Sequence, residues 1–122
     1  MANLTKLDVL YLMSNRISDI PESIFELPNL SVLFINDNPI KSLTTRIAEL
    51  QNLKILIASS CSLAELPESL YAMDSLVVLH LAGNRLTKFP ADLPRMKSLQ
   101  SLDLSYNKNL PEEEKRRVIK AL

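Results

Sequence analysis

Residues 7–24, LDVLYLMSNRISDIPESI, contain a pattern that returns every 23 residues along the chain. Apolar residues occupy the first, fourth and sixth positions of this stretch, and Asn15 occupies the ninth. The aligned columns are Leu4, Leu27, Leu50, Met73 and Met96; Leu7, Leu30, Leu53, Leu76 and Leu99; Leu10, Leu33, Leu56, Leu79 and Leu102; Leu12, Ile35, Ala58, Leu81 and Leu104; and Asn15, Asn38, Cys61, Asn84 and Asn107. Self-similarity at this period indicates a repeat protein.

The alternation of side chains around the fourth and sixth positions predicts one short strand in each unit, with one side buried. We expect the strands at 9–11, 32–34, 55–57, 78–80 and 101–103, stacked in parallel. Each unit can bury its leucines only against the units on either side, so the repeats must form a continuous solenoid.

The asparagine column is expected to hold the turns together. A buried turn leaves backbone donors and acceptors unpaired, which is costly. An amide side chain both donates and accepts, so stacked asparagines can satisfy the turns of adjacent units. This would explain how the chain turns with a single glycine, Gly83. Cys61 occupies the same column, and we interpret it as a structural residue that hydrogen-bonds less well than asparagine.

After each turn the chain must return along the opposite side. Segments 21–26 and 67–71 each begin with proline and are predicted to be short helical or 3₁₀ segments. The second unit has Thr44 in place of that proline, so its segment is the one expected to differ.

With proline after the second apolar pair (Ile20-Pro21, Leu66-Pro67, Phe89-Pro90), the pattern resembles the 23-residue subtype of the leucine-rich repeat. That subtype occurs in scaffolds such as Scribble and Erbin, in plant Ras-group repeat proteins and in proteins of bacterial pathogens. The resemblance covers nearly the whole chain. It implies an α/β, right-handed solenoid of five coils within 1–110, starting near 4, 27, 50, 73 and 96, with a concave parallel sheet.

The two ends of the solenoid carry different expectations. Residues 111–122, PEEEKRRVIKAL, are predicted to form a C-terminal capping helix, with Val118, Ile119 and Leu122 on one face. The repeat pattern begins at Leu4, so the first coil is expected to have an uncovered edge. Either the chain was cut from a longer protein, or this edge is tolerated or paired.

Charge and cysteine content exclude several classes of function. The chain has 14 basic and 14 acidic residues, spread evenly, which argues against nucleic acid or an anionic membrane surface as the main partner. The sequence has no apolar stretch long enough to span a membrane, so we expect no membrane insertion. The single cysteine, Cys61, excludes an internal disulfide and a cysteine-based metal site, and we expect no cofactor. One thiol is compatible with the cytoplasm, and secretion stays open if a signal peptide was removed.

The resemblance implies that the concave sheet binds a partner. Its outward-facing rows are Val9, Val32, Ile55, Val78 and Ser101; Tyr11, Phe34, Ile57, His80 and Asp103; and Met13, Asn36, Ser59, Ala82 and Ser105. Nine of these 15 residues are apolar, more than a solvated face requires. The preference of β-branched residues for strands explains the valines but not the adjacent Tyr11 and Phe34. The predicted partner-binding residues are Val9, Tyr11, Met13, Val32, Phe34, Ile55, Ile57, Val78, His80 and Asp103.

A catalytic interpretation of His80, Asp103 and Ser101 is weaker. Diagonal neighbours across a sheet are roughly 7–8 Å apart, so we expect Ser101 to lie beyond hydrogen-bond reach of His80. A cross-strand pair of His80 with Asp103 is the expected arrangement. No phosphate-binding loop, metal-ligand cluster or dinucleotide fingerprint occurs in the sequence.

The sequence therefore predicts a non-catalytic module that binds a protein of unspecified identity. The alternative is a structural or assembly fragment of a larger scaffold that self-associates through the uncovered N-terminal edge. Host-surface or glycan binding by a secreted bacterial protein is a third hypothesis, which the sequence neither favours nor excludes.

Overall fold

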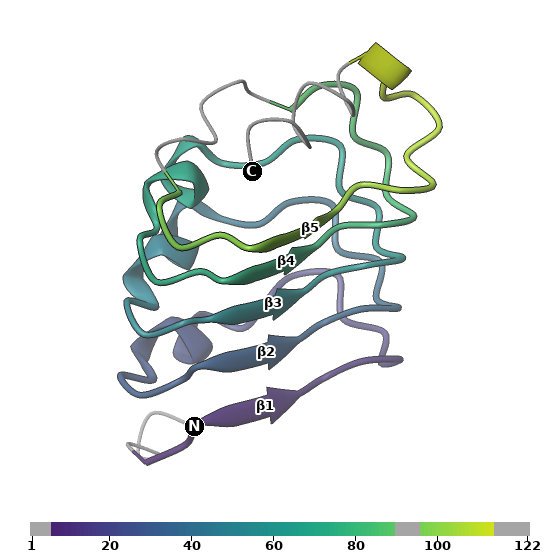
Figure 1. Cartoon of the computed structure of the whole chain (residues 1–122). Helices are drawn as coiled ribbons and strands as arrows, with labels where there is room; N and C mark the ends of the chain where they lie inside the picture. The colour runs from purple at the N-terminus through teal and green to yellow at the C-terminus, as the bar shows by residue number, and fades with distance from the viewer. Residues whose placement is uncertain (1–5, 90–95, 114–122) are drawn as a thin grey trace.

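The computed structural model describes residues 6–89 and 96–113. Within these residues one five-stranded parallel sheet has the order β1-β2-β3-β4-β5 (Figure 1). The strands are β1 (Val9–Tyr11), β2 (Val32–Phe34), β3 (Ile55–Ile57), β4 (Val78–His80) and β5 (Ser101–Asp103). All five strand positions that the repeat predicted are confirmed, and the chain forms the expected solenoid.

The strands pair without any offset from the 23-residue period. Val9 lies opposite Val32, and Val32 lies opposite Ile55, so each residue is beside its equivalent in the next coil. The same register continues from β3 to β5. Each column of the sequence therefore becomes a straight row of side chains across the sheet.

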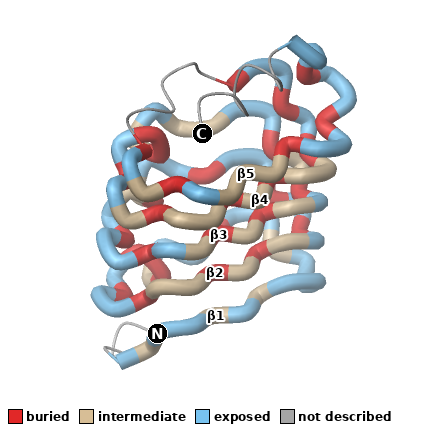
Figure 2. The backbone as a smooth tube through the Cα atoms, in the orientation of Figure 1, coloured by how far each residue is buried: buried red, intermediate tan, exposed pale blue. Residues whose placement is uncertain are grey.

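The core lies between the sheet and the convex segments, where Figure 2 shows the buried residues in red. The central residues of the inner strands, Leu33, Leu56 and Leu79, are fully buried. Leu10 is only partly buried, and β1 is the first strand of the described sheet, with β2 as its neighbour. Residues 1–5 lie outside the described residues, so the uncovered edge of the first coil stays a prediction.

Three 3₁₀ segments line the convex side within the described residues: η1 (Glu22–Glu26), η2 (Thr45–Glu49) and η3 (Glu68–Ala72). The expectation that the second unit would differ is wrong. Thr44 has the same extended conformation, φ −70° and ψ 163°, as Pro67, with φ −69° and ψ 145°. An extended residue at this point is sufficient, and Ile47 of η2 is fully buried.

Each turn contains a residue with left-handed backbone, immediately before the asparagine column. In the described residues these are Ser14, Asp37, Ser60, Gly83 and Tyr106, with φ between 54° and 69°. A left-handed residue other than glycine costs on the order of 1–2 kcal/mol. Something in the turn must therefore offset that cost in four of the five coils.

The buried asparagine side chains provide the offsetting interactions. The side-chain Nδ2 of Asn38 donates to the carbonyl oxygens of Leu12 and Ile35, both at 2.9 Å. Its Oδ1 accepts from the backbone N–H groups of Asn15 and Ile17, both at 3.1 Å. The equivalent bonds join Asn84 to Ala58, Leu81 and Leu63, and Asn107 to Leu81, Leu104 and Leu86. One amide thus bonds its own turn and the preceding one, as predicted.

Cys61 replaces the asparagine in the third turn and forms weaker bonds. Its Sγ lies 3.4 Å from the carbonyl oxygen of Ile35, to which it donates. The backbone N–H of Ile40 donates to the Asn38 carbonyl at 2.8 Å, whereas the equivalent N–H groups elsewhere donate to an asparagine Oδ1. Burial raises the pKa of the Cys61 thiol. The structural interpretation of Cys61 agrees with this environment.

The predicted capping helix falls mainly on residues 114–122, which lie outside the described residues. The cap and the 111–122 boundary therefore stay predictions.

Substituting Cys61→Asn should stabilise the fold. The new amide would restore the strong bonds that Asn38 and Asn84 make, and one net hydrogen bond contributes about 1 kcal/mol. Urea denaturation should show a free energy of unfolding higher by about this amount. Cys61→Ala, which removes the thiol without adding an amide, should be less stable than the native chain. A Cys61→Asn variant no more stable than the native chain would contradict this account of the turn.

Candidate protein-binding surface

The concave face of the sheet is lined by side chains that flank the buried central residue of each strand. Those on the first coil are exposed: Val9 by 37%, Tyr11 by 60% and Met13 by 38%. The equivalent side chains of β2 and β3 are half-buried, as are Val78 and His80 of β4 and Asp103 of β5. The structure therefore brings all the predicted partner-binding residues onto one face, in the rows that the sequence indicated.

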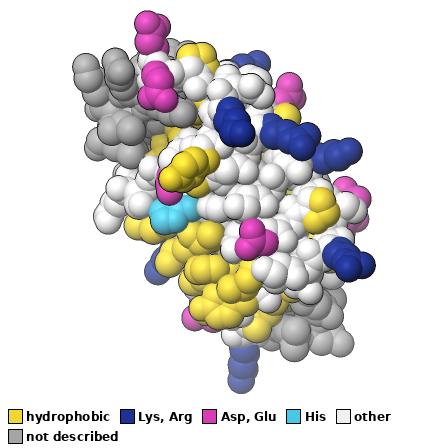
Figure 3. Space-filling view, turned by 90° about the vertical axis from the view of Figure 1, so that its right-hand side faces the viewer, with side chains coloured by type: hydrophobic (Ala, Val, Ile, Leu, Met, Phe, Trp, Pro, Cys, Tyr) yellow, Lys and Arg dark blue, Asp and Glu magenta, His cyan; other side chains and the backbone are white. Residues whose placement is uncertain are grey.

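The aromatic pair is the centre of the apolar part of this face. The rings of Tyr11 and Phe34 lie edge to face, with centroids 4.9 Å apart and an interplanar angle of 88°. Ile57 follows Phe34 in the same row. Apolar side chains form a patch that adjoins the single histidine in Figure 3. Edge-to-face packing holds the Tyr11 ring in place while it stays accessible.

The rows become polar on β4 and β5, at the C-terminal end of the sheet. Nε2 of His80 lies 3.1 Å from Oγ of Ser101. Oδ1 of Asp103 accepts from the backbone N–H of Ser105 at 3.0 Å and from its hydroxyl at 2.6 Å. The hydrogen bonds from Ser105 lower the pKa of Asp103, with a smaller effect from His80. Asp103 is therefore charged at neutral pH.

The expected arrangement of His80, Ser101 and Asp103 is wrong. Ser101 is within hydrogen-bond distance of His80, and Asp103 bonds Ser105 instead of His80. The distance between the backbones of His80 and Ser101 did not prevent their contact, because the long histidine side chain can lean along the strand toward Ser101.

The Ser101–His80 contact lacks the other parts of a nucleophilic site. A catalytic histidine is normally oriented by a third group, and Asp103 is engaged elsewhere. The backbone N–H of Leu81 is occupied by the Asp103 carbonyl, so it offers nothing to an oxyanion. The described residues include no group of three histidine, cysteine or acidic side chains placed to hold a metal ion. Nor does any helix among them have the length and apolar character to cross a membrane.

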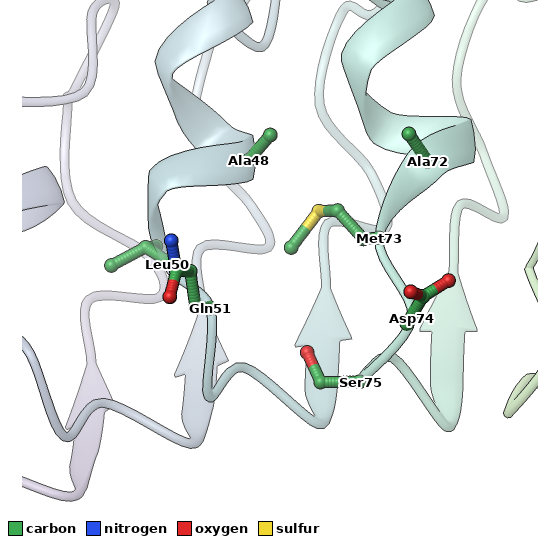
Figure 4. Close-up of a pocket in the computed structure, with 7 residues that line it drawn as sticks. All are labelled: Ala48, Leu50, Gln51, Ala72, Met73, Asp74 and Ser75. Atoms are coloured by element: carbon green, nitrogen blue, oxygen red, sulfur yellow. The ribbon is translucent and has the colours of Figure 1, made fainter.

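A groove between η2 and η3 lies away from the concave face, and Figure 4 shows its lining residues. Ala48, Leu50, Gln51, Ala72, Met73, Asp74 and Ser75 line it. Ala48 occupies the repeat position that holds Phe25 in the preceding coil and Tyr71 in the next. The Tyr71 ring packs against Phe89 with centroids 5.6 Å apart. The groove therefore lies where the convex side has the small Ala48 side chain instead of an aromatic ring.

A second hollow lies on the edge formed by the turns, and sequence reasoning did not identify it. It includes Tyr106, whose side chain is 80% exposed. The available signal was the column before the asparagines, where a large ring stands in line with serine, aspartate and glycine.

Comparison with known proteins identifies the repeat. A family model described as leucine rich repeat matches residues 5–63 and 51–108. A solved leucine-rich-repeat protein of Leptospira interrogans is 34% identical, with a TM-score of 0.91 over 99% of this chain and 31% of its own. Internalin C2 of Listeria monocytogenes is 29% identical, with a TM-score of 0.74 over 85% of this chain and 44% of its own.

The plant peptide hormone receptor RGFR1, solved in complex with RGF2, is 23% identical, with a TM-score of 0.75 over 91% of this chain and 20% of its own, and shows the fold alone. No curated protein matches the chain. The chain spans less than half the length of each of these three solved structures. Since the family model covers most of the sequence and the coils have the geometry that the model describes, the chain belongs to the leucine-rich repeat family.

Proposed function

We propose that this chain is a non-catalytic module that binds a protein partner on the concave face of its sheet. The observation that carries the proposal is the exposed Tyr11 ring packed against Phe34, within a patch of apolar side chains. Contiguous apolar patches on a soluble surface mark interaction sites, and aromatic residues are their usual anchors. Leucine-rich repeat domains generally mediate protein–protein binding, which supports the proposal.

The residues proposed to bind the partner lie on the opposite side of the sheet from the residues that form the core. The core side chains of the strands, such as Leu33 and Leu56, point away from the concave face and are fully buried. Tyr11 and Phe34 flank this core on the other side of the sheet. Truncating the aromatic pair therefore removes binding area with little loss of core packing.

The double substitution Tyr11→Ser with Phe34→Ser should abolish capture of the partner. Truncation of a binding hot spot commonly costs about 2 kcal/mol or more, which is roughly thirtyfold in affinity. Partners are isolated with the native chain as bait, identified by mass spectrometry and titrated against each variant. The melting temperature of the double variant should change little.

Glu68→Ser is the matched control, because Glu68 is exposed on η3 at the convex side. This variant should bind like the native chain. If the double variant keeps the affinity of the native chain, or if Glu68→Ser loses as much, the concave-face proposal is wrong.

Assembly through β1 is a second candidate function, and the geometry of that strand favours it. β1 is the terminal strand of the described sheet, and Leu10 within it and Leu7 and Leu12 on either side of it are only partly buried. A terminal strand has unpaired backbone groups on its outer side, and exposed Lys6 and Asp8 offer modest protection.

This candidate predicts self-association that depends on concentration. Light scattering over a concentration series should show a rising mean mass. In the monomer, hydrogen exchange should be faster at residues 9–11 than at 55–57, because the inner strand is paired on both sides. A chain that stays monomeric, with equal protection at the two strands, would exclude assembly through this edge.

A further inference from the structure

At one edge of the solenoid, the turns of the last three coils form a cleft that is part of neither the hydrophobic core nor the concave face. Its walls are formed by residues from three successive turns: Cys61, Ser62, Gly83, Asn84, Arg85, Tyr106, Lys108 and Asn109. This edge faces the viewer in Figure 3, where several Lys and Arg side chains lie on its upper half. The cleft is therefore on a different surface from the proposed protein-binding face.

Two cations stand next to each other in this cleft. Arg85 and Lys108 occupy the same repeat position in successive coils, and both are exposed. Coils whose strands pair in register are about 4.8 Å apart, so the two side chains start from neighbouring points. Neither of the ion pairs found between described residues, Arg46 with Glu22 and Arg46 with Glu49, involves Arg85 or Lys108. Adjacent like charges repel, and an anion bound between them would remove that repulsion.

Tyr106 adds an aromatic surface at the same place. It has left-handed backbone, with φ 58°, and its side chain is 80% exposed. A bulky residue at positive φ is uncommon and strained, and such strain gathers at binding sites. The other described turns use serine, aspartate or glycine at this position. The Tyr106 side chain buries little surface, and its backbone conformation is strained. Its ring therefore does not stabilise the fold.

Gly83 lines the cleft without a side chain. Its φ is +69°, and an added Cβ would lie 3.3 Å from Oγ of Ser60. The glycine lies between the Ser60 turn and the Tyr106 turn. Gly83 therefore packs closely against the Ser60 turn, and its backbone forms part of the cleft wall.

We propose that this cleft binds a phosphate monoester carried on an aromatic ring. A phosphate monoester carries close to two negative charges at neutral pH, matching the two cations, and guanidinium and ammonium groups both donate charge-assisted hydrogen bonds to its oxygens. The flat ring of the ligand stacks on the Tyr106 ring. The site is independent of the concave face and of the protein partner proposed for it.

The test uses phenyl phosphate as the probe, titrated into the isotopically labelled chain at low ionic strength, where exposed charges are least screened. The amide signals of Gly83, Asn84, Arg85 and Lys108 should shift together and saturate. Inorganic phosphate, which lacks the ring, and phenol, which lacks the charge, should each bind more weakly than phenyl phosphate.

Variants separate the two parts of the site. Arg85→Gln with Lys108→Gln should weaken phenyl phosphate binding by about tenfold or more, since each charged hydrogen bond is strong. Tyr106→Ser places the residue of the first and third turns in the last one, and should weaken phenyl phosphate but not inorganic phosphate. Arg16→Gln is the matched control, because Arg16 holds the same repeat position in the first coil, outside the cleft.

The proposal is overturned if phenyl phosphate gives no saturable shift at the cleft, or if Arg16→Gln weakens binding as much as the double substitution. Equal affinity for inorganic phosphate and phenyl phosphate would overturn the role of Tyr106. All the substituted side chains are exposed, so thermal melting should confirm that each variant is folded.

Discussion

The side-chain amides of the three buried asparagines are the interaction on which the rest of the solenoid depends. Asn38, Asn84 and Asn107 each donate to a carbonyl in their own coil and to one in the preceding coil, and accept from the preceding coil. These bonds satisfy backbone groups that the turn buries, and they fix the distance between coils. They also offset the strain of left-handed residues, so the chain can turn with glycine in one of the five described turns.

Because the turns hold the coils in register, the surfaces of the molecule follow from the sequence columns. A zero-offset register places Tyr11 beside Phe34 and aligns both with Ile57, so an apolar patch forms from residues that are 23 positions apart. The same register places Arg85 beside Lys108 on the turn edge. The two surfaces use different columns, so the partner proposed for the sheet and the ligand proposed for the turns would not compete for the same side chains.

The strands, their order and the core were predictable because the period is strict and each column has one environment. Three features were not predictable in this way. Thr44 was expected to change its segment, but it adopts the same extended conformation as Pro67, and η2 forms without the proline. The partner of His80 depended on the reach and direction of a side chain, which the column pattern does not specify. The exposure of Tyr106 depended on the left-handed backbone of the residue before the asparagine, a conformation that the column pattern does not specify.

The most direct test of the asparagine account compares Asn84→Ala with Asn15→Ala by urea denaturation. Asn84 is buried and bonds two coils, whereas the described bonds of the exposed Asn15 side chain stay within its own turn. Asn84→Ala leaves buried backbone groups of two coils unpaired and should lower the free energy of unfolding by about 3 kcal/mol or more, and Asn15→Ala by about 1 kcal/mol or less. Equal and small losses for the two variants would show that apolar stacking alone holds the coils together, and would contradict the account.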